Sequence, residues 1–182
     1  MDFCVNHVNF WFPNSNTCSL HEAIGSSNSP DNWPKLDFIP AMQRRRLSPF
    51  AKIALHVANK TSEDTKESLP IIFSSRHGDL HKTSTLLADL STETPLSPTA
   101  FSLSVHNAIP SLYSILTDNK QALNAISAGK DTFFFSLIDA YARLTSGIAD
   151  RILLIHADQK LPETYQGFKD ELQLSHAISM II

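Results

Sequence analysis

A turn between two apolar segments, at residues 126–135 (ISAGKDTFFF), has the layout of a nucleophile site in an α/β enzyme. A strand-like run at residues 122–127 leads into it, and a helix-like run begins at Lys130 or Asp131. Such turns hold nucleophiles because the N-terminus of a helix stabilises negative charge. The turn offers a lysine, an aspartate and a threonine, but no cysteine. The segment is therefore arranged for a reactive group that it does not contain.

The segment RHGDLH, at residues 76–81, is a second candidate site. His77, Asp79 and His81 are side chains that ligate zinc or iron, and the two histidines share a face if the segment is helical. A helix that joins both histidines turns Asp79 away, because alternate residues share a face only in a strand. The alternative is a strand-to-helix turn whose polar groups satisfy the backbone and line a pocket. Both readings stay open, and we expect neither a metal nor a cofactor.

Other polar residues have weaker links to chemistry. Ser74 and Ser75 lie close to His77, as a serine hydrolase would require, but no G-x-S-x-G elbow surrounds either serine. His106 and Asn107 lie in an apolar segment, where such a pair usually ties a helix to neighbouring backbone through hydrogen bonds. Two further histidines among aliphatic residues have the same interpretation: His56 and His156.

Two clusters could meet partners. The basic cluster at residues 44–46 (RRR) could attract an acidic partner, or it could form the solvated start of a helix. The aromatic cluster at residues 133–135 (FFF) lies in a helix-like segment, so its side chains point about 100° apart. They cannot all face one core. We expect at least one to meet a second apolar surface, such as a partner subunit or a ligand channel, unless the helix forms a thick internal layer.

The composition narrows the class of protein. With 182 residues, 42% hydrophobic and 18% charged, the chain fits one globular domain over residues 1–182. A net charge of -3 argues against nucleic acid as the main partner. The two cysteines, Cys4 and Cys18, form neither a disulfide framework nor a zinc pattern. No signal peptide and no membrane span is expected, which favours a cytoplasmic protein.

Strand-like and helix-like segments alternate along the chain, which predicts an α/β layered domain with a mostly parallel core sheet. Pro110 is expected to kink its helix unless a short break precedes it. The expected strands are residues 2–12, 69–75, 121–129, 150–158 and 174–182. The expected helices are residues 17–25, 42–60, 78–91, 100–117 and 131–147.

Several of these stretches together resemble the N-terminal half of a thiolase-fold ketosynthase. The chain is especially similar to the short β-ketoacyl synthase-like proteins of bacterial aryl polyene clusters. The resemblance covers roughly residues 36–158 and extends to the tail SHAISMII. It implies half of a thiolase-like fold, an α/β layered mixed sheet with helices on both faces. The stretches that carry it are FIPAMQRRRLSPFAKIAL, IIFSSRHGDLHKTSTLL, PLSPTAFSLSVHNAIPSLYSI, ISAGKDTFFFSLIDAYARL and ILLIHAD.

The resemblance implies that the catalytic cysteine is missing. In active ketosynthases the strand similar to QALNAIS leads to the nucleophilic cysteine, and counting back from Gly147 places it at Lys130 or within one residue. The degenerate position is therefore Lys130-Asp131. An amine replaces a thiolate poorly, because at neutral pH it is ordinarily protonated. The two histidines of active ketosynthases belong to a C-terminal half that we expect this chain to lack, so condensation by this chain alone is not expected.

A noncatalytic relative of this kind is, in type II polyketide systems, a chain length factor. The resemblance therefore implies a heterodimer or heterotetramer with an active ketosynthase, with acyl carrier protein reached through that ketosynthase. The strand at residues 121–127 would pair edge to edge with the partner, because edge pairing satisfies exposed backbone groups. The expected interface residues are Gln121, Leu123, Ala125, Ser127 and Phe134.

The same resemblance implies a tunnel that this chain helps to shape for the growing acyl or polyene product. Two alternatives remain: a free-standing hydrolase or metal-dependent acyl-group enzyme that uses RHGDLH, and a module that binds acyl carrier protein. The expected tunnel and gating residues are Leu80, His81, Thr83, Phe101, Val105, His106 and Phe133.

Overall fold

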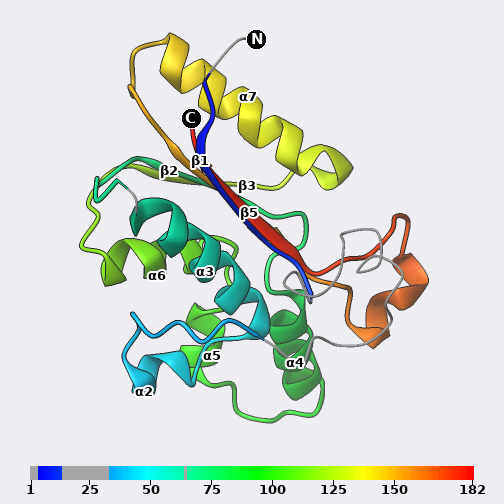
Figure 1. Ribbon diagram of the computed structural model, residues 1–182. Coiled ribbons are helices and arrows are strands. Elements are labelled where there is room, and N and C mark those ends of the chain that lie inside the picture. The colour runs from blue at the N-terminus through cyan, green and yellow to red at the C-terminus, as the bar shows by residue number, and fades with distance from the viewer. Residues whose placement is uncertain (1–3, 14–32, 64) are drawn as a thin grey trace.

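The computed structural model describes residues 4–13, 33–63 and 65–182, and these residues share one five-stranded sheet (Figure 1). Its strands are β1 (Asn6–Trp11), β2 (Ile71–Ser74), β3 (Leu123–Ile126), β4 (Leu153–Asp158) and β5 (His176–Ile181). They lie in the order β1-β5-β4-β2-β3. β2 pairs parallel with both β3 and β4, whereas β5 is antiparallel to β4 and β1 is antiparallel to β5. The sheet is mixed, and its parallel part is limited to three strands.

Burial explains which strands are central. All four residues of β2 are buried, and the first five residues of β4 are buried as well. Continuous apolar strands of this kind are stable when helices cover both faces of the sheet. β3 is only half-buried and forms one edge, and β1 forms the other. The strand predicted at residues 69–75 is therefore confirmed as a central strand.

The helices lie on both faces of the sheet. They are α2 (Ala41–Arg44), α3 (Pro49–Glu63), α4 (Leu80–Ser91), α5 (Pro98–Ser102), α6 (Ala108–Leu116) and α7 (Thr132–Thr145). α3 and α6 cover one face and α7 lies across the other (Figure 1). Successive strand residues point to opposite faces, so Phe73 packs in the core beneath α3 and Ile72 in the core beneath α7. Within the described residues, no helix is long and apolar enough to span a membrane.

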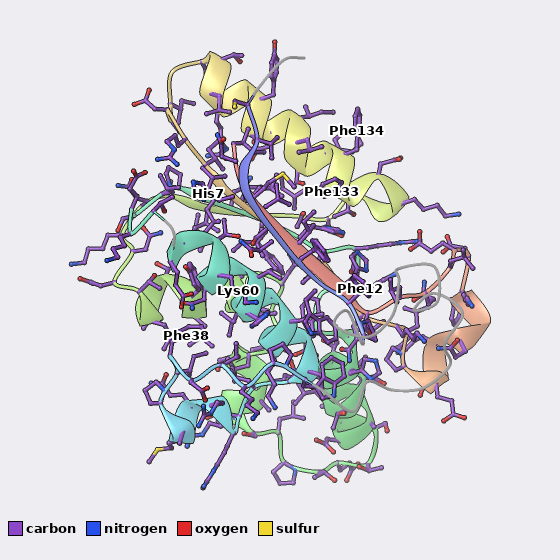
Figure 2. All side chains as sticks on the ribbon, viewed as in Figure 1. His7, Phe12, Phe38, Lys60, Phe133 and Phe134 are labelled. Carbon is purple, nitrogen blue, oxygen red and sulfur yellow. The ribbon has the colours of Figure 1, made fainter. Side chains whose placement is uncertain are left out.

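The aromatic cluster at residues 133–135 divides between the two faces of α7. Phe133 packs against the core formed by the sheet and α7. Phe134 and Phe135 are 57% and 48% exposed, and Figure 2 shows Phe134 on the side of α7 away from Phe133. Their rings contact each other edge to face at 6.5 Å. Two of the three aromatic side chains are thus left without a covering layer in this chain.

Two predicted helices are each broken in two, and proline is the reason in both. The helix expected at residues 42–60 is α2 followed by α3, because a residue before proline disfavours helical backbone. Ser48 instead caps α3, its hydroxyl accepting from the Ala51 amide at 3.1 Å. The helix expected at residues 100–117 is α5 followed by α6, with Pro110 in the first turn of α6, where its missing N–H costs nothing. The helix expected at residues 17–25 lies outside the described residues.

Candidate functional site

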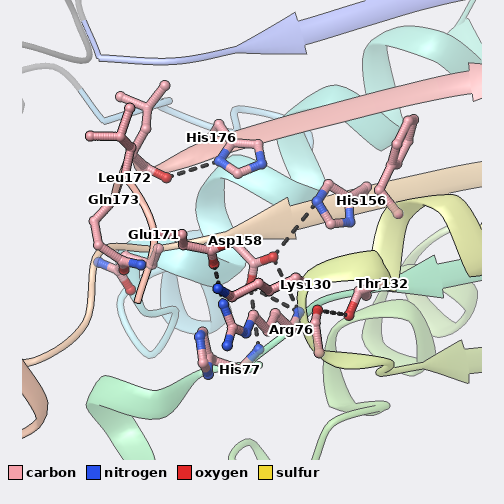
Figure 3. Close-up of a pocket in the computed structure, with 14 residues that line it drawn as sticks. Arg76, His77, Lys130, Thr132, His156, Asp158, Glu171, Leu172, Gln173 and His176 are labelled. Atoms are coloured by element: carbon pink, nitrogen blue, oxygen red, sulfur yellow. Dashed lines mark hydrogen bonds and ion pairs between the residues drawn. The ribbon is translucent and has the colours of Figure 1, made fainter. Parts of the chain in front are cut away.

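A pocket of about 220 Å³ opens where the parallel strands end (Figure 3). The turns after β2 and β3, the end of β4 and the segment before β5 supply its walls. Ligand sites in α/β sheets form at the carboxyl ends of parallel strands, and this pocket has that position. We call it the strand-end pocket. Its lining residues are Arg76, His77, Gly129, Lys130, Thr132, Phe133, His156, Asp158, Gln159, Glu171, Leu172, Gln173, Leu174 and His176.

Asp158 organises the turn that follows β2. Its carboxylate accepts a hydrogen bond from the Ser75 hydroxyl at 2.9 Å and from the Arg76 amide at 3.0 Å. The His77 amide donates to the same carboxylate at 3.3 Å. The carboxylate lies at the end of β4, and the amides that donate to it lie in the turn after β2. Such charge-assisted hydrogen bonds fix the conformation of the turn that leads from β2 to α4. The Asp158 carboxylate therefore stabilises this turn, and most of its hydrogen-bonding capacity is used there.

His156 is the buried titratable group of the pocket. Its Nδ1 lies 3.0 Å from the Ser74 hydroxyl, and its ring lies 5.1 Å from the Phe133 ring between centroids. Burial lowers the pKa of His156 to about 4, with a further lowering by His176 and an opposing pull from Asp158. The imidazole is thus neutral at neutral pH.

Ser74, His156 and Asp158 together contain the residue types of a hydrolytic triad. The His156 Nε2 lies 3.6 Å from the Asp158 carboxylate, and Nδ1 faces the serine. Ser74, however, is fully buried, at the end of a strand that pairs with a neighbour on each side. A nucleophile must reach its substrate, and this hydroxyl cannot. Ser75 is also buried, and its hydroxyl donates to Asp158 and accepts from Gly78. These serines stabilise the strand end and do not form a hydrolase site.

The turn after β3, which would hold a nucleophile, is built as a tight 3₁₀ turn (Gly129–Asp131). Gly129 has φ +62°, the left-handed region that favours glycine. The Thr132 hydroxyl donates to the Gly129 carbonyl at 2.7 Å and accepts from the Ala128 amide at 2.9 Å. Asp131 is exposed and makes no side-chain cap to α7.

Lys130 points from this turn toward the opposite wall of the pocket. Its ammonium donates to the Asp170 carbonyl at 3.1 Å and lies 3.4 Å from the Asp170 carboxylate. The Arg76 guanidinium contacts the same carboxylate through two nitrogens, at 2.9 and 3.0 Å, and also Glu171 at 2.5 Å. The hydrogen bonds from Arg76 are the main reason why the pKa of Asp170 falls to about 2. Lys130 is therefore an ion-pairing residue in this structure.

The RHGDLH segment does not gather its three polar side chains around one point. Asp79 caps α4 by accepting from the Lys82 amide at 3.2 Å. The His81 Nε2 lies 2.8 Å from the Lys160 carbonyl, while His77 lines the strand-end pocket. Among the residues that the structure describes, no group of three metal-ligating side chains is placed to hold an ion. The arrangement agrees with the interpretation of this segment as a strand-to-helix turn whose polar groups bond to the backbone and line a pocket.

The expected tunnel residues occupy two separate regions. Phe133 lines the strand-end pocket beside Lys130. The other six line no part of this pocket and lie on or near α4, α5 and the turn before α6: Leu80, His81, Thr83, Phe101, Val105 and His106. The His106 Nε2 contacts the Ser75 carbonyl at 2.8 Å, which ties the turn before α6 to the end of β2.

Four of the five expected interface residues lie at or beside the open edge of the sheet formed by β3, and the fifth, Phe134, lies on α7. The Ala122 and Ile126 carbonyls accept from β2 and its flanks, so the alternate residues of β3 direct their backbone groups outward. These alternate positions within β3 are Leu123 and Ala125, both among the predicted ones; Gln121 lies exposed before the strand and Ser127 directly follows it. The Ala125 amide donates to the Asn124 side chain at 3.0 Å.

Several residues of the site escaped prediction from the sequence. In the sequence, Arg76 and His77 stand out only as members of RHGDLH, and His156 has the surroundings of a core residue. Asp158 stands out only as the last residue of ILLIHAD, and Asp170 belongs to none of the motifs named above. The available signal was position, since Arg76 follows one parallel strand and Asp158 ends the next. The ends of neighbouring parallel strands meet at one edge of a sheet, so polar residues there converge.

Comparison with solved structures finds the same fold in ketosynthases. A chain of the complex of the ketosynthase ApeO with its chain length factor ApeC from Xenorhabdus doucetiae aligns with a TM-score of 0.80 and 22% identity, over 98% of this chain and 77% of that chain. The ishigamide ketosynthase/chain length factor aligns with a TM-score of 0.58 and 14% identity, over 81% of this chain and 48% of that one. A β-ketoacyl synthase from Burkholderia phymatum STM815 aligns with a TM-score of 0.60 and 11% identity, over 97% and 52%. At these identities the likeness shows the fold.

The chain thus spans about three quarters of the first of these relatives and about half of the other two. No curated protein matches the sequence. A sequence profile described as β-ketoacyl synthase, N-terminal domain, matches residues 19–182. The match confirms the resemblance drawn from the sequence, and the thiolase-like mixed α/β fold agrees with it. The chain belongs to the β-ketoacyl synthase N-terminal domain family.

Proposed function

We propose that this chain is a noncatalytic subunit, similar to a chain length factor, that pairs with an active ketosynthase and shapes the cavity that receives the growing chain. The pathway class we propose is type II polyketide synthesis of the aryl polyene kind. In this proposal the chain supplies a surface and a wall, and the partner supplies the thiolate and the acid–base groups.

The observation that carries the proposal is the turn after β3. A condensing enzyme needs a nucleophile there that can be deprotonated and acylated. Residues 127–133 contain no cysteine, and the one amine among them, Lys130, is engaged with Asp170. Cys4 lies beside β1, at the far edge of the sheet from β3. The residues of this turn can form part of a cavity wall, but no side chain among them can carry an acyl group as a thioester.

The open edge at β3 supports a partner subunit. Its outward backbone groups need hydrogen-bond partners, and a strand added in register supplies them. The outer face of α7 continues this surface with Phe134 and Phe135, both about half exposed. Large exposed apolar groups beside an open sheet edge are typical of an obligate interface. The two features lie on adjacent elements, so one partner can cover both.

The alternatives receive less support. A hydrolase would need an accessible serine, and Ser74 and Ser75 are buried. A metal-dependent enzyme would need His77, Asp79 and His81 to converge, and the last two have hydrogen bonds in other directions. A module that binds acyl carrier protein without a ketosynthase would have no use for an open strand edge.

Co-expression with a candidate ketosynthase tests the proposal. We expect a stable complex of the two chains on size exclusion, and a product whose length changes when this chain is left out. Intact-mass measurement during turnover should find the acyl group on the ketosynthase alone. An acyl adduct on this chain would overturn its noncatalytic role.

The interface is tested by Ala125→Pro. Proline at this outward-facing position removes a donor from the open edge while the ladder to β2 stays intact. We expect the variant to fold, by circular dichroism, but to lose the ketosynthase. The control is Val8→Ser on the opposite edge strand β1, where the side chain is 49% exposed. If both variants keep the partner, or both lose it, pairing through β3 is wrong.

A further inference from the structure

One wall of the strand-end pocket is a short segment between the chain after β4 and the start of β5. Residues 171–174 line the pocket, and Asp170 directly precedes them. On the other side of the pocket stand Arg76, after β2, and Lys130, after β3. Figure 3 shows Glu171 and Gln173 on one side and Lys130 and Thr132 on the other. The segment at residues 170–174 is called the pocket wall below.

Charged contacts cross from one side to the other. Arg76 holds the Asp170 carboxylate with a two-pronged contact at 2.9 and 3.0 Å and reaches Glu171 at 2.5 Å. The Lys130 ammonium donates to the Asp170 backbone carbonyl at 3.1 Å and lies 3.4 Å from the Asp170 carboxylate. We call these four residues the charged latch. A two-pronged arginine contact within a network is the case in which a partly exposed ion pair retains strength.

The far end of the wall is attached differently. The Gln173 side chain accepts from the Leu161 amide at 3.2 Å, and the Ser175 hydroxyl accepts from the Lys160 amide at 3.3 Å. These bonds tie residues 173–175 to the chain that leaves β4. Asp170 and Glu171 carry the charged contacts instead, and Leu172 beside them is 78% exposed. The wall therefore has an end near β5 that is fixed by uncharged hydrogen bonds, and an end that is held, among the described residues, by the charged latch.

The interior of the pocket carries an unmet hydrogen-bonding group. Within the part of the chain that the structure describes, the Gln159 Oε1 is buried and accepts no hydrogen bond. A buried acceptor without a partner is costly unless another group or water can reach it. Gln159 lines the pocket behind the wall, so an entering group with an N–H or O–H would satisfy it.

We propose that Lys130, in the turn where a ketosynthase holds its nucleophile, acts with Arg76 as a latch that sets the position of residues 170–172 and thereby the space inside the strand-end pocket. The two cations are specificity-determining residues in this role. The consequence for chain length rests on the proposed function, since the pocket must then form part of the cavity for the growing chain. The latch itself does not depend on that function.

Ionic strength and charge removal should both loosen the latch. Salt screens contacts between partly exposed charges, with a Debye length that falls to about 3 Å at 1 M. The Arg76 side chain is 16% exposed and the Lys130 side chain 55% exposed. Removing Arg76 deletes more contacts, so we expect the larger effect from its substitution.

The test measures how fast a reagent reaches the inside of the pocket. The reporter is Gln159→Cys in a chain that also carries Cys4→Ser and Cys18→Ser. This position is suitable because the Gln159 Oε1 makes no hydrogen bond that the substitution would break. The purified chain, alone or with its ketosynthase, is treated with iodoacetamide, and labelling is followed by mass spectrometry.

We expect the labelling rate to rise by roughly three- to tenfold with Arg76→Gln, and by a smaller factor with Lys130→Gln. Raising the salt concentration should increase the rate in the parent chain and leave the Arg76→Gln rate nearly unchanged. The matched control is Arg151→Gln, which removes a similar arginine–glutamate contact with Glu67 far from the pocket. Its labelling rate should equal that of the parent.

Rates within twofold of the parent for both latch variants, with no response to salt, overturn the latch. Should Arg76→Gln fail to fold, Lys130→Gln and the salt series still decide the question, because Lys130 is largely exposed. Product length is then measured for Lys130→Gln in the ketosynthase complex. A change in labelling with unchanged product length keeps the latch and contradicts the cavity role in the proposed function.

Discussion

Acid should destabilise the fold through His156 before it affects the carboxylates. The imidazole is 7% exposed, and burial is the main reason why its pKa is lowered to about 4 from 6.5. A buried histidine that is already neutral keeps the same charge at high pH, so its contribution to the free energy of unfolding does not change there. Below about pH 6.5 the unfolded chain takes up a proton that the folded chain refuses, so stability falls as pH falls from about 6.5 to about 4.

The size of the effect follows from the two pKa values. The limiting difference is about 2.5 pKa units, which corresponds to roughly 3 kcal/mol. At about pH 5 the unfolded histidine is almost fully protonated and the folded one is mostly neutral, which gives a loss of about 2 kcal/mol relative to about pH 7.5. His56, whose pKa is lowered by burial and by Lys60, adds to the slope of the parent chain in the same direction.

The assay is urea unfolding at the two pH values, followed by tryptophan fluorescence. The chain has two tryptophans, and Trp11 stacks on Trp33 at 5.4 Å between ring centroids, so unfolding changes their surroundings. The comparison is between the parent and His156→Gln, which retains a hydrogen-bonding group near Ser74 but cannot titrate. We expect the parent to lose about 2 kcal/mol more than the variant between these pH values.

The comparison cancels contributions from His56 and from the carboxylates, which both chains share. If the parent and His156→Gln show the same pH dependence within about 0.5 kcal/mol, the buried imidazole is not the titrating group. A larger loss in the variant would reverse the sign of the argument and refute it.

Other predictions concern the turns around the same pocket. Asp158→Ala should lower the free energy of unfolding by about 2–4 kcal/mol, measured by urea unfolding, because it leaves the buried Ser75 hydroxyl and two backbone amides without their acceptor. Gly129→Ala should cost about 1 kcal/mol through its φ of +62° alone, since nothing lies within 4 Å of an added methyl group. Gly167→Ala has the same open space without the positive φ, so an equal cost there would contradict this reason.

Much of the fold could be predicted from periodicity. The apolar run at residues 71–74 indicates a central strand, and residues 132–145 have the spacing of a helix with two apolar sides. The two broken helices show the limit of this reasoning. Pro49 and Pro110 lie in the first turns of α3 and α6, where proline can start a helix as well as interrupt one, and apolar spacing continues across both breaks.

The sequence alone determined that the turn after residues 123–126 holds a lysine and no cysteine, because that follows from residue identity at one local position. It also determined the family, through motifs that are contiguous in the chain. Only the tertiary structure decided what the lysine contacts. Arg76 and Asp170 are 94 residues apart, and Ser75 and Asp158 are 83 apart. Such pairs meet only because the sheet places β2 between β3 and β4, and no local pattern records that order.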